Sequence, residues 1–286
     1  MKVVLIHGRS HGGLDPAEVQ AAWEEALREG LRVAGLAWPD ELEVAFPFYA
    51  DELDRLVAQI QAPVLGVATR GPAADPKDVA LQAELLEELA RGQGVTDAEV
   101  QAHFGGEAHE RGPLNWGWVH AMFRAMDRTP LGGAVLEQFT RDVSLYLNYR
   151  TVRRVIDAIV ARHLGPGPCV VVGHSLGSVI GYHVLGHAPE DVEVRRFVTV
   201  GSPLGLAAVR KRLDAPLRMP GCVQGWFNAK DPRDGVALYP LDDPYFGVDP
   251  AITNKLDVEN FTDNRHGVIG YLADPTVAGW IHAALR

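Results

Sequence analysis

The sequence predicts an α/β fold, with a mainly parallel central sheet that is covered by helices on both faces. Short apolar runs rich in β-branched residues recur along the chain, amphipathic helical patterns separate them, and glycine-bearing turns follow several of them. The chain has 286 residues, of which 47% are hydrophobic, enough to bury one large core. We therefore expect residues 1–286 to form a single domain.

The first part of the chain follows this strand and helix alternation. A strand is predicted at residues 2–6, where the apolar run KVVLI ends at a His-Gly pair. An Asp-Pro pair at 15 and 16 is typical of a helix start and predicts a helix over residues 16–30. A second strand is predicted over residues 42–49, and a short helix over residues 51–61.

Residues 51–165 are expected to form a mostly helical insertion, a lid or cap, before the next strand. Helical patterns cover residues 76–91 and 133–164, whereas the glycine- and aromatic-rich residues 104–123 fit neither a helix nor a strand. One apolar set in this insertion has two open interpretations, which are packing of a helical lobe onto the sheet and a pocket for an acyl chain. Its members are Trp116, Trp118, Met122, Phe123 and Met126.

The last third of the chain returns to alternating strands and helices. Strands are predicted at residues 169–173, 196–200 and 223–228. A helix is expected to follow the first of these at residues 176–187, and a final helix is expected at residues 274–285, after another Asp-Pro pair. Parallel pairing of these strands with those near the amino terminus is the simplest arrangement.

Residues 173–177 read Gly-His-Ser-Leu-Gly and lie between a predicted strand and a predicted helix. A sharp turn there would lift the hydroxyl of Ser175 above the edge of the sheet, and flanking glycines allow the neighbouring backbone to pass close by. The alternative is that Ser175 is only a helix N-cap. An N-cap requires only one of these features, whereas the strand, the flanking glycines and the helix all coincide here. We therefore predict that Ser175 is a nucleophile.

Four segments, VVLIHGRS, GHSLGS, VGSPLG and WFNAKDPRDGVA, together resemble the α/β-hydrolase family, in particular its lipase- and esterase-like bacterial members. They span the core of the chain but not the insertion. The resemblance implies a serine hydrolase that cleaves carboxylic esters through an acyl-enzyme and a Ser-His-Asp triad. It also implies that the acid follows the second strand after the nucleophile, and that the histidine precedes the last helix.

Two aspartates, Asp231 and Asp234, follow the strand predicted at residues 223–228, and both lie in turn-forming sequence. The resemblance favours an Asp-x-Val pattern followed by Pro or Ala, which Asp234-Gly-Val-Ala matches. The same pattern fits badly when it is counted from Asp231. Asp234 is therefore the expected acid, and Asp231, the alternative acid, is expected to be a turn residue.

The sequence holds eleven histidines. His266 follows both aspartates, lies in turn-rich sequence and precedes the final helix, so it is the expected base. His174 lies inside the turn itself, where its side chain is expected to point away from the serine hydroxyl. His183, His187 and His282 fall in predicted helices and are interpreted as packing or surface residues.

An oxyanion hole is expected from two backbone N–H groups. Leu176, directly after the nucleophile, should supply one of them. The resemblance implies that Arg9, just after the first His-Gly, supplies the other, with Ser10 as the alternative. His7 and His11 have a spacing that suits a metal pair only on a helix, and the glycines around them argue against one, so no metal is expected.

The composition restricts the partners. The formal net charge is -10, and no basic block is present that could neutralise a run of phosphates, which argues against nucleic acid. The start MKVVLIHG lacks the features of a signal peptide, and no apolar run approaches the ~20 residues that span a bilayer, so a cytoplasmic protein without a stable membrane anchor is expected. Cys169 and Cys222 are expected to be reduced thiols.

The expected substrate is a small-molecule ester or a lipid, and no cofactor is expected. A thioesterase, an amidase or an acyltransferase with the same triad is the alternative, as is a non-catalytic binding protein on the same scaffold. The natural substrate and the oligomeric state are not indicated by the sequence.

Overall fold

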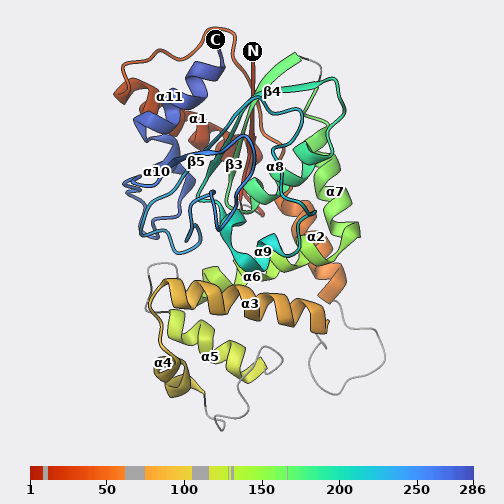
Figure 1. Cartoon of the computed structure of the whole chain (residues 1–286), viewed down its shortest axis with the longest axis vertical. Coiled ribbons are helices and arrows are strands. Elements are labelled where there is room, and N and C mark those ends of the chain that lie inside the picture. The colour runs from red at the N-terminus through yellow and green to blue at the C-terminus, as the bar shows by residue number, and fades with distance from the viewer. Residues whose placement is uncertain (9–11, 62–74, 105–115, 128, 130–131, 166) are drawn as a thin grey trace.

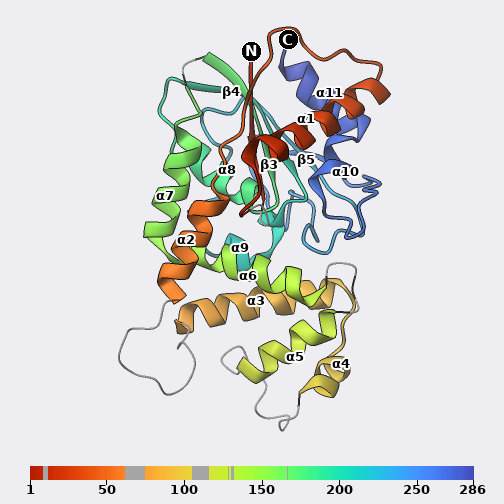
Figure 2. The same ribbon diagram turned by 180° about the vertical axis from the view of Figure 1, so that it is seen from behind.

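The computed structural model describes residues 1–8, 12–61, 75–104, 116–127, 129, 132–165 and 167–286. Within these residues, a single parallel sheet of six strands runs in the order β2-β1-β3-β4-β5-β6. Helices lie on both faces of this sheet, as Figures 1 and 2 show from opposite sides. The predicted α/β class, with a parallel sheet between two helical layers, is therefore confirmed.

The strands are β1 (Lys2–Ile6), β2 (Glu43–Ala45), β3 (Gly167–His174), β4 (Val192–Val200), β5 (Trp226–Ala229) and β6 (Thr253–Lys255). Five of them fall on predicted strands, although β2 is shorter than expected and β4 begins earlier. The sequence did not predict β6. Its residues, Thr-Asn-Lys, carry no apolar alternation, and the strand lies at the edge of the sheet, paired with β5.

The central strands are buried on both faces. In β1, Val3 and Leu5 belong to the core on one side of the sheet, and Val4 and Ile6 belong to the core on the other side. Successive side chains of a strand point to opposite faces, so a continuous apolar run satisfies both helical layers at once. This is why the KVVLI run forms an inner strand.

One face of the sheet is covered by α1 (Pro16–Val33), α10 (Val268–Leu272) and α11 (Pro275–Ala284), and the other by α2 (Ala50–Gln61), α7 (Arg150–Ala161) and α8 (Leu176–Gly186) (Figure 1). The start of α1 is as predicted: Asp15 caps it by accepting a 2.8 Å hydrogen bond from the N–H of Ala17. The start of α11 is capped in the same way by Asp274, which accepts from Thr276 at 2.8 Å.

A separate layer of helices, which we call the helical lobe, lies at one end of the sheet (Figures 1 and 2). It consists of α3 (Pro76–Gly92), α4 (Asp97–His103), α5 (Trp116–Met126) and α6 (Gly133–Asn148). Glu88 of α3 joins the lobe to the body, because its carboxylate accepts hydrogen bonds of 2.9 and 3.2 Å from the N–H groups of Ala207 and Ala208. Those residues begin α9 (Ala207–Arg210), which follows η2 (Pro203–Gly205) after β4.

A buried carboxylate holds the lobe together. Asp78 of α3 accepts hydrogen bonds from Ser144 at 3.2 Å, from Asn148 at 2.8 Å and from Tyr149 at 2.6 Å. Tyr149 also ends α6 with extended backbone, so the helical stretch expected over residues 133–164 is divided into α6 and α7. Because the Asp78 carboxylate accepts from three donors, it fixes the backbone at the junction between α6 and α7.

Helix α5 starts within residues 104–123, which the sequence pattern assigned to neither helix nor strand. The apolar side chains of α5 are buried in the hydrophobic core that the lobe shares with one face of the sheet. They are Trp118, Met122, Phe123 and Met126. Their burial favours packing of the lobe over an open acyl pocket at these four side chains.

Two further expectations concern cysteines and membranes. Cys169 and Cys222 are free thiols, and burial raises the pKa of Cys169 to about 11. In the described part of the chain, no helix has both the length and the apolar character that crossing a bilayer requires.

Candidate active site

Ser175 lies at the turn between β3 and α8, with φ 52° and ψ −125°. A positive φ is uncommon outside glycine and costs conformational energy, so it persists only where the surrounding structure holds it. Here the N–H of Ser175 donates a 3.2 Å hydrogen bond to the carbonyl of Val200, at the end of the neighbouring strand β4. The tight strand-to-helix turn expected from the sequence is therefore present.

The glycines around Ser175 are required by close backbone approaches. A Cβ atom at Gly177 would collide with the carbonyl oxygens of Ile6 and His7, and one at Gly173 would lie 2.8 Å from the carbonyl oxygen of Gly177. A Cβ at Gly8 would lie 2.9 Å from Cβ of Ser175, so the loop after β1 passes directly beside the serine. Side chains at these positions would push the serine and this loop apart.

Ser175, His266 and Asp234 form a continuous chain of contacts. Nε2 of His266 lies 2.9 Å from Oγ of Ser175, and Nδ1 lies 2.8 and 3.0 Å from Oδ2 and Oδ1 of Asp234. All three residues are buried, with exposures of 2% for Ser175, 9% for His266 and 2% for Asp234. Low water content around such a chain strengthens its electrostatic interactions.

Asp234 accepts from four donors. Its Oδ1 atom accepts from the N–H groups of Val236 at 2.8 Å and Ala237 at 3.1 Å, and its Oδ2 atom accepts from the hydroxyl of Tyr271 at 2.6 Å in addition to the imidazole of His266. Burial alone would raise the pKa of this carboxyl. The electrostatic interaction with the imidazole of His266 and the hydrogen bonds outweigh burial, so the pKa of Asp234 is lowered.

The ionised carboxylate determines the tautomer of His266. Asp234 can only accept, so Nδ1 of the imidazole carries the hydrogen and donates it. Nε2 then presents a lone pair to Ser175 and accepts a hydrogen bond from its hydroxyl. In this state the imidazole can act as a general base toward the serine.

Asp231 has a different environment from Asp234. Its Oδ1 atom accepts a 2.7 Å hydrogen bond from the N–H of Arg233, and its Oδ2 atom accepts one of 2.8 Å from the N–H of Asn260. The carboxylate thus closes the turn after β5 and ties it to the segment that leads to His266. Asp234 is the aspartate that faces the imidazole, in agreement with the Asp-x-Val pattern that ends at Val236.

The loop that carries His266 is held by two asparagines. Asn260 donates from Nδ2 to the carbonyl of Gly267 at 2.8 Å, and Oδ1 of Asn264 accepts a 3.0 Å hydrogen bond from the N–H of His266. Sequence reasoning did not single out Asn260, Asn264 or Tyr271. The Asn-Arg-His turn was a visible signal for the loop, but it did not indicate which side chains fix it.

His174 and Gly201 also lie beside the imidazole. Nε2 of His174 donates a 2.7 Å hydrogen bond to the carbonyl of His266, and the two rings lie 4.8 Å apart between centroids. His174 therefore contacts the histidine loop, which fits the expectation that it points away from the serine hydroxyl. Gly201 has φ 57°, and a Cβ there would lie 3.2 Å from both His266 and Asp234.

The loop after β1 is anchored by His7. The N–H of Tyr49 donates to Nε2 of His7 at 3.1 Å, and Nδ1 donates to the carbonyl of Gly8 at 2.6 Å, so both ring nitrogens are used. The Tyr49 ring stacks on this imidazole at 4.0 Å. The expected oxyanion donor Arg9, its alternative Ser10, and His11 lie outside the described residues.

Leu176, the other expected oxyanion donor, is the first residue of α8. The first N–H groups of a helix have no partner within the helix, and they carry partial positive charge. Such groups can stabilise an anionic oxygen that forms next to Ser175. The start of α8 therefore provides a favourable environment for a developing oxyanion.

No model of a known protein family matches the sequence, and no curated protein matches it. The chemical interpretation of the site consequently rests on the arrangement of its own side chains.

Proposed function

We propose that the protein is a serine hydrolase of the α/β-hydrolase type, which cleaves carboxylic esters through an acyl-enzyme. The observation that carries this proposal is the buried chain of contacts from Ser175 through His266 to Asp234. Nucleophile, base and orienting acid within hydrogen-bond distance of one another are the arrangement that activates a serine.

In the proposed first half-reaction, Oγ of Ser175 attacks the carbonyl carbon of the ester while Nε2 of His266 takes its proton. Asp234 stabilises the resulting imidazolium and keeps its Nδ1–H in place. The N–H of Leu176 and the start of α8 stabilise the oxyanion. His266 then returns the proton to the leaving alcohol, and the acyl group remains on Ser175.

In the second half-reaction, water attacks the acyl-enzyme. His266 takes a proton from the water and returns it to Oγ of Ser175, which releases the acid and restores the enzyme. The backbone N–H groups act on the second oxyanion as they do on the first.

The order of the elements supports the same proposal. The serine follows β3 in the middle of the sheet, Asp234 follows β5, two strands further along, and His266 precedes the last two helices. This is the arrangement that the resemblance to α/β-hydrolases implies, and the parallel sheet is compatible with it.

We further propose that the helical lobe caps the substrate side of the site. A Cβ at Gly92, the last residue of α3, would collide with Leu238, four residues after Asp234. Glu88 of the same helix binds the N–H groups at the start of α9. These contacts hold the lobe against the loops that follow β4 and β5, so it can limit the size of the acyl group.

A fluorophosphonate probe tests the proposal, because it phosphonylates activated serines. Wild-type protein should be labelled once per chain and should hydrolyse p-nitrophenyl esters. Ser175→Ala should lose both properties, with a fall in turnover on the order of 10⁴- to 10⁶-fold. Ser144→Ala, which removes a buried serine hydroxyl in the lobe, should keep both.

A panel of matched acyl esters, thioesters and anilides then separates the esterase from the thioesterase and amidase alternatives. Labelling of Ser175→Ala at the wild-type rate would contradict the nucleophile assignment. A wild-type protein that neither reacts with the probe nor hydrolyses any member of the panel would contradict the enzyme proposal as a whole.

A further inference from the structure

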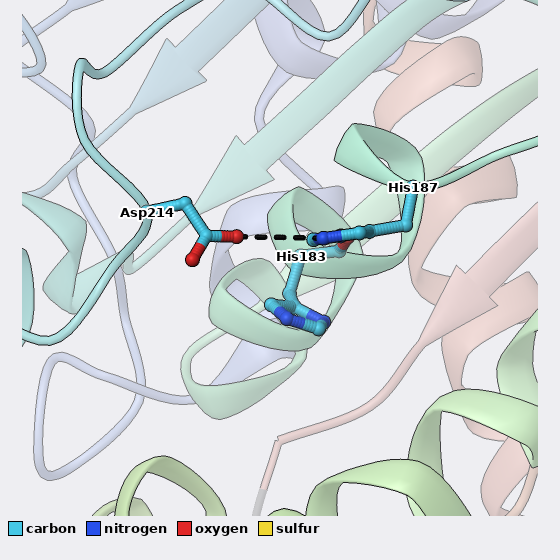
Figure 3. Close-up of side chains that lie close together, drawn as sticks. All are labelled: His183, His187 and Asp214. Carbon is cyan, nitrogen blue, oxygen red and sulfur yellow. Dashed lines mark hydrogen bonds and ion pairs between the residues drawn. The ribbon is translucent and has the colours of Figure 1, made fainter.

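A second cluster of chemically active side chains lies away from the candidate active site. His183 projects from the last turn of α8, His187 is the residue directly after this helix, and Asp214 approaches them from the segment after α9 (Figure 3). One ligand atom from each residue lies within 4.8 Å of the others. The sequence pattern indicated packing or surface roles for these two histidines, and Asp214 could not be linked to them because it is distant in the chain.

The two histidines are four residues apart across the end of α8, and this spacing brings their side chains to the same side of the helix end. Their rings lie 4.4 Å apart between centroids with an angle of 33° between planes. His183 is half-buried, and His187 and Asp214 are exposed, so an ion can reach the cluster from solvent. The depression beside it is also lined by Tyr182, Leu213, Pro216 and Arg218.

Each imidazole has its Nδ1 atom close to an oxygen of the protein. Nδ1 of His187 donates a 2.8 Å hydrogen bond to the carbonyl of His183. Nδ1 of His183 lies 2.9 Å from Oδ2 of Asp157 on α7, and Oδ1 of Asp157 accepts a 2.7 Å hydrogen bond from Tyr146. Such outer partners are typical of metal-binding histidines, because they orient the ring and leave Nε2 for the metal.

The contact between His187 and Asp214 is compatible with a cation between the two side chains. With its hydrogen on Nδ1, a neutral His187 turns the lone pair of Nε2 toward Oδ2 of Asp214, only 3.4 Å away. Two lone pairs repel each other at this distance unless a proton or a metal ion lies between them. Zinc bonds of about 2.0–2.2 Å in a tetrahedral site put two ligand atoms about 3.3 Å apart, close to the observed separation.

We propose that His183, His187 and Asp214 form a binding site for a divalent transition-metal ion, with Zn²⁺ as the preferred ion. Nε2 of each histidine and a carboxylate oxygen of Asp214 are the ligands, and water completes a tetrahedral shell. Two imidazoles with one carboxylate favour zinc over magnesium or calcium, which prefer oxygen ligands. Asp157 is the positioning residue of this site, because its carboxylate lies 2.9 Å from Nδ1 of His183 and attracts that nitrogen when Nε2 holds the ion.

The bound ion would act as a structural link. Helix α8 begins directly after Ser175, and with a rise of about 1.5 Å per residue the first ligand, His183, lies about 12 Å along the helix from the serine. The ion would therefore fasten the end of α8 to the segment that carries Asp214, without touching the reacting atoms. This proposal does not depend on the proposed hydrolase activity.

Isothermal titration with Zn²⁺ tests the site on full-length protein that has been freed of metal and of any affinity tag. Wild type should bind one zinc ion per chain, and the melting temperature should rise with the zinc concentration. His187→Gln combined with Asp214→Asn should abolish this binding. Asp157→Asn should weaken it by about 10- to 100-fold, as expected for an outer partner of a ligand.

A matched control separates the site from general attraction to an acidic surface. Glu190→Gln removes an exposed negative charge close to the end of α8 and should leave zinc affinity unchanged. Cobalt(II) should occupy the same site and give the intense visible absorption of a tetrahedral complex, and excess Mg²⁺ should not displace it. Absence of zinc binding by wild type, or equal binding by the His187→Gln, Asp214→Asn variant, would overturn the proposal.

Discussion

The hydroxyl of Tyr271 donates a 2.6 Å hydrogen bond to Oδ2 of Asp234. The same hydroxyl accepts a 3.0 Å hydrogen bond from the N–H of Asp231, so one phenol joins the acid side chain to the backbone of its own loop. Because Nδ1 of His266 shares Oδ2, the tyrosine helps to fix the direction in which the carboxylate faces the imidazole.

Tyr271→Phe should lower both activity and stability. The change leaves the ring in place but removes one donor from a buried carboxylate and one acceptor from a buried N–H, and a hydrogen bond to a charged group contributes about 1.5–3 kcal/mol. We expect kcat to fall about tenfold with KM little changed, since about 1.4 kcal/mol corresponds to a factor of ten in rate. Steady-state kinetics and urea unfolding measure the two effects.

A matched control for this variant is Tyr182→Phe, which removes a largely buried hydroxyl that donates to the carbonyl of Arg218 at 3.2 Å. It should cost stability without changing kcat. If Tyr271→Phe behaves like Tyr182→Phe, with reduced stability and unchanged kcat, Tyr271 has only a structural role.

Asp234→Asn and Asp231→Asn should separate the two aspartates. The first keeps the shape of the side chain but no longer holds Nδ1–H of His266, so turnover should fall by on the order of 10⁴-fold while the fold is retained. The second weakens the acceptor of the Arg233 and Asn260 N–H groups, so it should mainly lower the free energy of unfolding. A severe loss of kcat in Asp231→Asn alone, with stability intact, would reverse the assignment of the acid.

The contribution of Asp234 to the free energy of unfolding should decrease at acid pH. Its pKa in the folded protein is lowered, through His266 and the hydrogen bonds that outweigh burial, below the value of about 3.9 expected for an unfolded chain. A lowered pKa means that the contribution is complete above the unfolded pKa and is lost as the pH falls through the folded pKa. The difference in free energy of unfolding between wild type and Asp234→Asn should therefore shrink from pH 5 to pH 3. Urea unfolding at a series of pH values measures it, and a difference that grows toward pH 3 would contradict the prediction.

The parts of the fold that the sequence predicted are those with strong local patterns. The apolar runs of β1 and β3 and the Asp-Pro starts of α1 and α11 require only neighbouring residues, and all four elements are present. Strand β6 and helix α5 were missed for physical reasons. The polar residues of β6 extend because β5 offers them hydrogen bonds, and α5 is fixed by burial of its apolar side chains in the core that contains the lobe.

The same distinction applies to the candidate site. Ser175 is recognisable from its own turn, and Asp234 was named because the resemblance favours the Asp-x-Val pattern that ends at Val236. Asn260 and Tyr271 contribute through contacts with residues 29 and 37 positions away. Such contacts exist only after the sheet has aligned the loops that follow its strands, and no local pattern indicates them.

Gly177→Ala should damage both the turn at the serine and the stability of the protein. The added methyl group would collide with Ile6 and lie 2.5 Å from the carbonyl oxygen of His7, and backbone at that position cannot move aside as a flexible side chain can. Forcing extra volume into such a contact should cost about 3 kcal/mol or more. Because His7 and Gly8 lie in the loop beside Ser175, kcat should fall as well.

Gly186→Ala is the matched control in the same helix, because a Cβ there meets nothing within 4 Å. It should be neutral or should stabilise the protein by up to about 1 kcal/mol, since alanine favours helix more than glycine does. Thermal unfolding and ester hydrolysis of both variants check the pair. Equal stability and equal kcat in the two variants would show that α8 can shift away from β1, and that the close approach at Gly177 is not what holds Ser175 in its turn.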